Sequence, residues 1–242
     1  MKLDEQARVL VSPRYLAGRG DRLTDVLGPL IHLFGWSSAH DPETGHIAVS
    51  SPDGALLVNF SPSTPSAPWW TITHRNPFWR IAATRQTPLE ALAGITQALP
   101  QLLGDTRHAD RIPLTKRSVA DIADLYGWIT DAGSSTSPDG HCTVHHAASQ
   151  PWRVEHSVHE GHEGFDTHWT VRSTGAVPVQ LPAQFLTCLA TPDPVERTLA
   201  DVPYLARREA RLTPLASHRS GLGAHVVHAL GDLVTNREGQ RR

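Results

Sequence analysis

Cysteine and lysine are scarce in this chain of 242 residues. The two cysteines, Cys142 and Cys188, each lie within an apolar run, so we interpret them as small buried side chains and not as a disulfide framework. Lys2 and Lys116 are the only lysines, and the net charge is −2. Because this charge is close to zero, the total charge gives no argument for a polyanionic ligand.

Long apolar runs are also missing. The longest ones fall far short of the about 20 residues that a membrane span needs. The N-terminus has no basic segment followed by an apolar stretch, so we expect no signal peptide. These features predict a cytoplasmic protein without a membrane partner.

Motifs of common enzyme chemistry are absent as well. The sequence contains no Gly-x-Ser-x-Gly elbow, no Gly-x-x-x-x-Gly-Lys loop and no dinucleotide fingerprint. Serine, histidine and aspartate are plentiful, so a catalytic triad assembled in space stays open, although no spacing predicts one. We expect a non-enzymatic protein with no catalytic residue and no cofactor.

An internal repeat is the strongest positive feature of the sequence, because its matches keep the same order in both copies. The matching segments are 33–36 with 125–128, 51–54 with 137–140, 70–74 with 152–156, and 79–100 with 169–190. The second pair is Ser-Pro-Asp-Gly in both copies. The chain is therefore predicted to contain two tandem copies of one unit.

Each block of the first copy predicts one element. Apolar residues at helical spacing predict a helix over 23–31 that ends near Gly35. Alternation around Ser51–Gly54 predicts a hairpin of strands 46–51 and 55–61, and strands 69–74 and 78–85 follow. Thr87–Glu90 predicts a capping box that opens a second helix. The predicted fold class is α+β: two copies of a helix, a four-stranded antiparallel sheet and a helix.

The second copy differs from the first at two places. A polar insert at 157–167 is expected between its third and fourth strands. Pro182 is expected either to lie in the first turn of its closing helix or to shorten that helix. The predicted organisation is 1–103 for the first unit, 104–117 for a polar linker, 118–206 for the acidic second unit, and 207–242 for a basic C-terminal extension with a short helix near 222–234.

Three segments carry a family resemblance. They are the opening Val11–Gly18 with Gly20-Asp21, the Ser-Pro-Asp-Gly hairpin, and Phe78–Arg80 followed by Thr87–Glu90. On these segments the chain resembles the DUF317 family, and with the repeat the likeness covers about 190 residues. The resemblance implies an actinobacterial protein, often with tandem copies of the domain. It implies no established activity and supplies no catalytic residue.

Charge is uneven along the chain. Residues 118–206 hold three basic and eleven acidic side chains, whereas 104–117 and 207–242 are net basic. A nucleic-acid footprint, specifically for DNA, is therefore expected on the first unit, the linker and the C-terminal extension. Arginines are expected to contact phosphate, and Trp70 is expected to stack on a base. The predicted nucleic-acid-binding residues are Trp70, His74, Arg75, Arg80, Arg85, Arg107, Arg111, Lys116, Arg117, Arg207, Arg208 and Arg211.

Three alternatives stay open. The tryptophans Trp69, Trp79, Trp152 and Trp169 also suit a core beneath the helices. The acidic second unit suits a scaffold that docks a protein partner or a second copy of the chain. Seven of the fifteen histidines lie within 141–168, and with nearby carboxylates they suit a divalent metal, but the glycines there favour a solvated loop, so no metal ligand is predicted.

Overall fold

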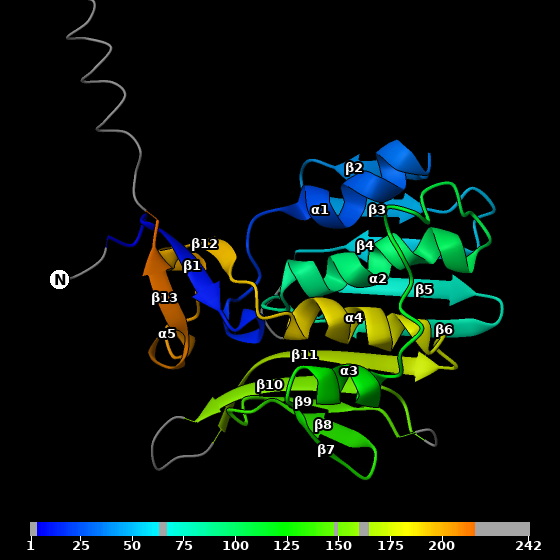
Figure 1. The fold of residues 1–242 in the computed structure, drawn as a ribbon. Helices are drawn as coiled ribbons and strands as arrows, with labels where there is room; N and C mark the ends of the chain where they lie inside the picture. Colours follow the sequence, from blue (N-terminus) through cyan, green and yellow to red (C-terminus); the bar gives the residue numbers. More distant parts are fainter. Residues whose placement is uncertain (1–3, 63–66, 148–149, 160–164, 216–242) are drawn as a thin grey trace, which may run out of the picture.

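A computed structural model describes residues 4–62, 67–147, 150–159 and 165–215. The fold is α+β, and its centre is one antiparallel sheet of ten strands (Figure 1). In spatial order the strands are β2 (Ser37–Asp41), β3 (His46–Ser50), β4 (Leu56–Phe60), β5 (Trp70–Arg75), β6 (Phe78–Ala83), β11 (Phe165–Gly175), β10 (Arg153–His159), β9 (Cys142–His145), β8 (Ser134–Thr136) and β7 (Ile129–Asp131).

The helices lie over one face of this sheet, as Figure 1 shows. They are α1 (Leu23–Gly28) with the π turn Pro29–Leu33, α2 (Leu89–Leu102), α3 (Val119–Leu125) and α4 (Gln180–Ala190). The helices α2 and α4 pack side by side, and Gly94 sits at their crossing, where a Cβ atom would lie 2.8 Å from the Cys188 sulfur. A glycine therefore lets the two helices approach closely.

A second sheet of three strands lies beside the large one. Its order is β12 (Val195–Thr198), β1 (Arg8–Ser12) and β13 (Arg211–Pro214), so the start of the chain pairs with segments after α4. The short helices Arg14–Leu16, Leu199–Asp201 and α5 (Ala206–Glu209) belong to this region. Tyr15 and Leu16 are buried, and the Tyr15 hydroxyl donates to Asp139, so the N-terminal segment braces the second half of the large sheet.

The hairpin predicted from Ser-Pro-Asp-Gly is confirmed in both copies, and the turns use the same hydrogen bonds. In each turn the serine hydroxyl donates to the aspartate carboxylate, as in Ser51 to Asp53 and Ser137 to Asp139. Each serine oxygen also accepts a backbone N–H across the turn, from Leu56 in one copy and Cys142 in the other. Local turn chemistry thus repeats with the sequence.

Four strands per unit are not confirmed. A fifth strand, β2 or β7, follows each Leu-x-Gly-Trp segment, and β6 pairs with β11, which makes the sheet continuous. The polar insert expected at 157–167 instead lengthens the β10–β11 hairpin on both sides, with a bulge at His156/Ser157. The predicted segment boundaries stay predictions, and the helix expected near 222–234 lies outside the described residues.

The capping box predicted at Thr87–Glu90 is wrong. The helix α2 begins at Leu89 without a side-chain cap, and the Thr87 hydroxyl is buried without a hydrogen-bond partner. Glu90 instead accepts two hydrogen bonds, of 2.8 and 2.7 Å, from the Arg197 guanidinium. The buried Arg197 guanidinium, which is 4% exposed, therefore holds the carboxylate that a capping box would have used. Pro182 lies in the first turn of α4, as predicted.

Candidate nucleic-acid interface

The face of the large sheet that the helices leave bare, here called the open face, is defined by strand register. Val58, Ile72 and Ile81 are cross-strand partners in the core, so the residues between them point the other way. Asn59, Thr71 and Ala82 form one such row, and it continues into Arg172 and Arg153. The open face is therefore polar and crosses the junction between the halves of the sheet.

Five exposed side chains form a cluster on this face. Arg75 lies opposite Phe78 at the β5–β6 turn, and Phe78 is 60% exposed. Arg80 lies two residues further along β6, on the same side of the strand. Arg172 and Arg153 are cross-strand partners on β11 and β10. We call Arg75, Phe78, Arg80, Arg153 and Arg172 the open-face cluster.

The electrostatics of this cluster favour an anion. Arg153 and Arg172 are directly opposite each other, and like charges in that arrangement destabilise a sheet. Among the described residues Arg153 has one acidic partner, Glu155 at 3.8 Å, and no ion pair joins Arg75, Arg80 or Arg172 to a carboxylate. The strands β4, β5 and β6 contain no acidic residue.

Some acids of the second half serve other places, whereas Glu155 and Asp131 lie on the open face near Arg153. Asp121 caps α3, Asp124 accepts from Thr130, and Asp139 accepts from Tyr15 and Ser137. Glu196 pairs with Arg8 in the small sheet. In the described part of its open face, the second half therefore carries two acids beside the two arginines Arg153 and Arg172, and not the full acidic excess of residues 118–206.

A family model described as "Domain of unknown function (DUF317)" matches residues 50–101 and 136–195. We call these two matched segments the DUF317 segments. The first runs from the β3–β4 turn to the end of α2, and the second from the end of β8 through α4 to the start of β12. No curated protein and no solved structure matches the chain.

The DUF317 segments contain the whole open-face cluster. The first carries Arg75, Phe78 and Arg80, and the second carries Arg153 and Arg172. Because β6 and β11 are neighbours, the two segments place these residues on one continuous surface. Of the residues predicted from sequence, Arg75 and Arg80 belong to this surface.

Trp70 and His74 lie on the other face. Trp70 is 1% exposed and packs 4.8 Å from Phe60 between ring centroids, so it presents no ring face to a base. This corrects the expectation that Trp70 stacks on a ligand. The His74 ring stacks on Trp79 at 5.6 Å, and its Nδ1 lies 2.8 Å from the Pro77 carbonyl oxygen. The core interpretation of the tryptophans holds for Trp79, Trp152 and Trp169, which are buried.

The remaining predicted cations are dispersed. Arg107 is paired with Asp105 at 2.6 Å, and Arg207 is paired with Glu5 at 2.8 Å. The guanidinium of Arg208 lies 5.8 Å from the centre of the Tyr204 ring, while Arg211 begins β13. The predicted footprint is therefore not one surface, because two of its arginines are paired with acids and the others lie on separate elements.

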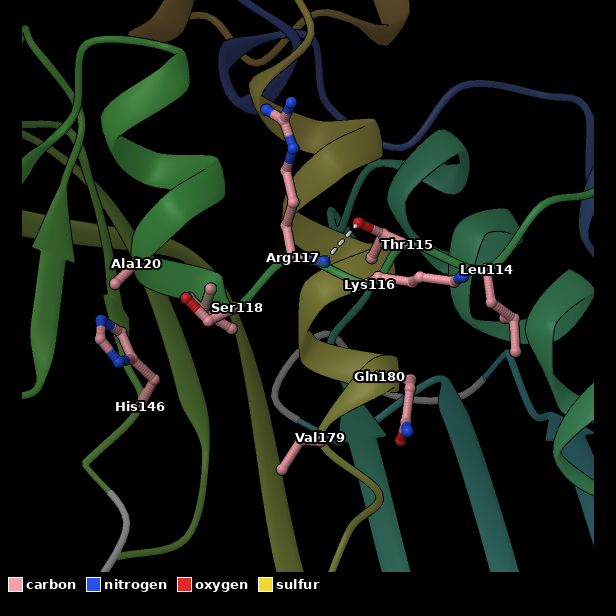
Figure 2. A pocket seen from close by; sticks show the side chains of 10 residues that line it. Leu114, Thr115, Lys116, Arg117, Ser118, Ala120, His146, Val179 and Gln180 are labelled. Carbon is pink, nitrogen blue, oxygen red and sulfur yellow. Dashed lines mark hydrogen bonds between the residues drawn. The ribbon is translucent and has the colours of Figure 1, made fainter.

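Linker residues Lys116 and Arg117 line a groove of about 760 Å³ between the starts of α3 and α4, which Figure 2 shows. His146 and Val179 lie across this groove from the linker. Arg111 belongs to the same linker, which is held to α4 by bonds between Gln184 and the backbone of Pro113 and Thr115. These cations lie on the helix side of the sheet and not on the open face.

Sequence reasoning missed Phe78, Arg153 and Arg172. The alternation of side chains along a strand was the signal that could have found them. Phe78 and Arg172 each neighbour a core residue, Trp79 and Val171, and therefore point to the opposite face. This alternation does not show by itself which face of the sheet the helices cover.

Metal binding finds no support in residues 4–62, 67–147, 150–159 and 165–215, where no group of three or more histidine, cysteine or acidic residues is placed to hold an ion. The histidine-rich stretch also contains 160–164, which lies outside the described residues. His156 is buried, and burial, followed by the nearby His168 and His141, lowers its pKa to about 3. None of the described helices has the length and apolar character needed to cross a membrane.

Proposed function

We propose that this protein is a non-enzymatic nucleic-acid-binding protein that takes a single strand on the open face of its sheet. The observation that carries the proposal is one exposed aromatic ring, Phe78, flanked by Arg75 and Arg80 and continued by Arg172 and Arg153 across the β6–β11 junction.

Each part of the cluster has a role in this proposal. The four arginines contact phosphates, and the ring of Phe78 stacks on a base. Arg80 and Arg153 lie two β-strands and two residues apart, which is about 12 Å, so a nucleic-acid strand that crosses β6, β11 and β10 meets both. Threonines of the open face, among them Thr71 and Thr73, supply uncharged hydrogen-bonding groups beside the path.

A single strand suits this surface better than a duplex. The face is a sheet with an exposed aromatic ring, and an unpaired base can leave its stack to lie on that ring. No described helix lies on the open face that could enter a major groove.

Binding of a labelled single-stranded oligonucleotide at several salt concentrations tests the proposal. Four phosphate contacts predict that the logarithm of the affinity falls with the logarithm of salt concentration with a slope of roughly −3. A double-stranded oligonucleotide of the same sequence is expected to bind more weakly. No binding at low salt, or an affinity that salt does not change, would contradict the proposal.

A matched pair of double variants locates the interface. Arg80→Gln with Arg172→Gln removes two open-face charges, and Arg111→Gln with Arg117→Gln removes two linker charges. We expect the first pair to lower affinity about tenfold or more and to reduce the salt slope by roughly 1.4, while the second pair leaves both unchanged. Equal losses from both pairs would show an unlocalised electrostatic attraction.

A protein-interaction scaffold is the second candidate, and the sheet edge favours it. The edge strand β7 carries Ile129, which is 67% exposed, and Leu125 beside it is also exposed. A partner strand could pair with β7 and cover Ile129. Light scattering of the wild type and of Ile129→Lys tests this role. A wild-type oligomer that becomes a monomer in Ile129→Lys would support it. A monomeric state of both proteins would count against it.

A further inference from the structure

The loop Gly18–Gly20 places Arg19 between two glycines whose backbone conformation favours glycine. Gly18 and Gly20 have φ angles of +68° and +80°. A Cβ atom at Gly18 would lie 2.8 Å from the Asp201 carbonyl oxygen, and one at Gly20 would lie 2.8 Å from the Arg197 guanidinium carbon. The loop therefore fits closely against the chain that follows β12.

Arg197 fixes this loop to the start of α2. Its guanidinium is bound by both oxygens of Glu90 and also donates to the carbonyls of Ala17 and Gly18. The N–H of Leu89, the first residue of α2, donates to the Arg19 carbonyl at 3.2 Å. The backbone of Arg19 is thus anchored on both sides.

The side chain of Arg19 meets a second arginine at Trp69. The guanidinium carbons of Arg19 and Arg85 each lie 5.1 Å from the centre of the Trp69 ring. Both arginines, with Gln86 and Asp201, line a polar hollow of about 80 Å³. That volume holds about two or three water molecules, which is the size of one tetrahedral oxyanion.

The charge in this hollow is not balanced by a bonded acid. Among the described residues neither Arg19 nor Arg85 forms an ion pair, although Asp201 lines the same hollow. Burial lowers the pKa of Arg19, and the neighbouring Arg85 lowers it further. Asp201 and Asp21 act in the opposite direction but do not offset these two effects. Arg19 is partly buried, Arg85 is exposed beside it, and of the described residues that line the hollow only Asp201 is acidic. Two guanidinium groups that repel each other and share a single unbonded carboxylate favour the binding of a further anion.

We propose that Arg19 and Arg85 form a binding site for a phosphate-class oxyanion. Each guanidinium offers several N–H donors, and two of them can hold the oxygens of one phosphate group from different sides. The site lies at the opposite end of β6 from Phe78, so it does not depend on nucleic-acid binding at the open face. The phosphate can come from the free ion, from a nucleotide or from the end of an oligonucleotide.

Calorimetric titration of the full chain with inorganic phosphate tests the site. We expect saturable binding that Arg19→Gln or Arg85→Gln weakens about tenfold, because each removes a charged hydrogen-bond donor. Arg111→Gln, which removes a linker arginine on the helix side of the sheet, is the matched control and is expected to change nothing. Far-ultraviolet circular dichroism of each variant checks that the fold is kept.

Asp201→Asn provides a test with the opposite sign. This substitution removes a negative charge from the hollow, so we expect phosphate affinity to rise about threefold. An absence of phosphate binding in the wild type, or equal binding in Arg19→Gln and the wild type, would overturn the proposal.

Oligonucleotides with a 5′-phosphate or a 5′-hydroxyl separate the sources of the anion. Tighter binding of the phosphorylated form, lost in Arg19→Gln, would assign the site to the end of a nucleic acid. Equal binding of both forms, together with binding of inorganic phosphate, would assign it to a free phosphate or nucleotide. Because this comparison depends on Arg19, its result does not follow from the effect of Arg80→Gln with Arg172→Gln.

Discussion

The two faces of the ten-stranded sheet differ in what their side chains can do. The covered face carries Val58, Ile72 and Ile81, which pack under α2 and α4 and are inaccessible. The open face carries threonines, arginines and Phe78, and no described helix covers it. One β-strand such as β6 contributes to both faces, with Trp79 on the covered face and Arg80 on the open face.

This difference shows that the charge available to a ligand is better counted for each face of the sheet than for each segment of the sequence. Residues 118–206 have a net charge of −8, which predicted repulsion of a polyanion from the whole second unit. Two of the three basic residues in that range, Arg153 and Arg172, nevertheless lie on the open face beside the first half's arginines. The proposed interface therefore crosses both DUF317 segments.

The largest expected effect concerns an ion pair on the covered side. Glu90→Gln leaves the Arg197 guanidinium, 4% exposed, without its carboxylate, and we expect the free energy of unfolding to fall by about 3 kcal/mol. Urea unfolding at neutral pH measures this loss. Binding of an oligonucleotide with a 5′-hydroxyl by the folded variant is expected to be unchanged, because Glu90 is not on the open face.

Thr87→Val is the matched control for that substitution. The Thr87 hydroxyl is buried without a partner, so replacing it with a methyl group is expected to be neutral or slightly stabilising. A capping box would give the opposite ranking, with a loss of about 1 kcal/mol from Thr87→Val. A Thr87→Val variant less stable than Glu90→Gln would contradict the structure at this helix start.

The next effect is a pH dependence that arises on the covered face. His156 packs against Trp169, Tyr15 and His168, and burial lowers its pKa to about 3, against about 6.5 in the unfolded chain. The unfolded state therefore binds the proton first, and stability falls as pH drops below about 6.5. Between pH 7 and pH 5 we expect His156 to account for a loss of about 2 kcal/mol.

The variant His156→Leu isolates this contribution. Its stability is expected to depend less on pH between 7 and 5 than that of the wild type, as thermal unfolding in the two buffers would show. His40→Leu is the control, because His40 is exposed on the edge strand β2. Equal pH dependence in His156→Leu and the wild type would mean that His156 is accessible to protons in the folded state.

Local elements could be predicted from the sequence because their causes are local. The Ser-Pro-Asp-Gly turns, the helix spacing of 23–31 and the apolar run of α2 each have a cause within a few residues. The edge strands β2 and β7 could not be predicted, because they are fully exposed and show no apolar alternation. Their extended form comes from pairing with β3 and β8.

The candidate site was only partly predictable for the same reason. The alternation of side chains predicts that Trp70, Ile72 and His74 share one side of β5. Which side of the strand the helices cover depends on packing between distant segments. The pairing of β6 with β11, which brings Arg172 near Arg80, joins residues about 90 positions apart and has no local cause. Arg19 and Arg85 likewise meet through the fold and not through spacing.

The smallest expected effect tests the open face alone. Phe78→Ala removes a ring that is mostly exposed, so we expect little change in stability but a loss of about 1 kcal/mol, or fivefold, in affinity for a single-stranded oligonucleotide. The salt slope is expected to stay the same, because no charge is removed. Val179→Ala, which trims an apolar side chain that is 76% exposed on the helix side, is the control and is expected to leave affinity unchanged. A Phe78→Ala variant that loses stability and keeps its affinity would instead place this ring in the packing of the β5–β6 turn, and the open face would then bind through its arginines alone.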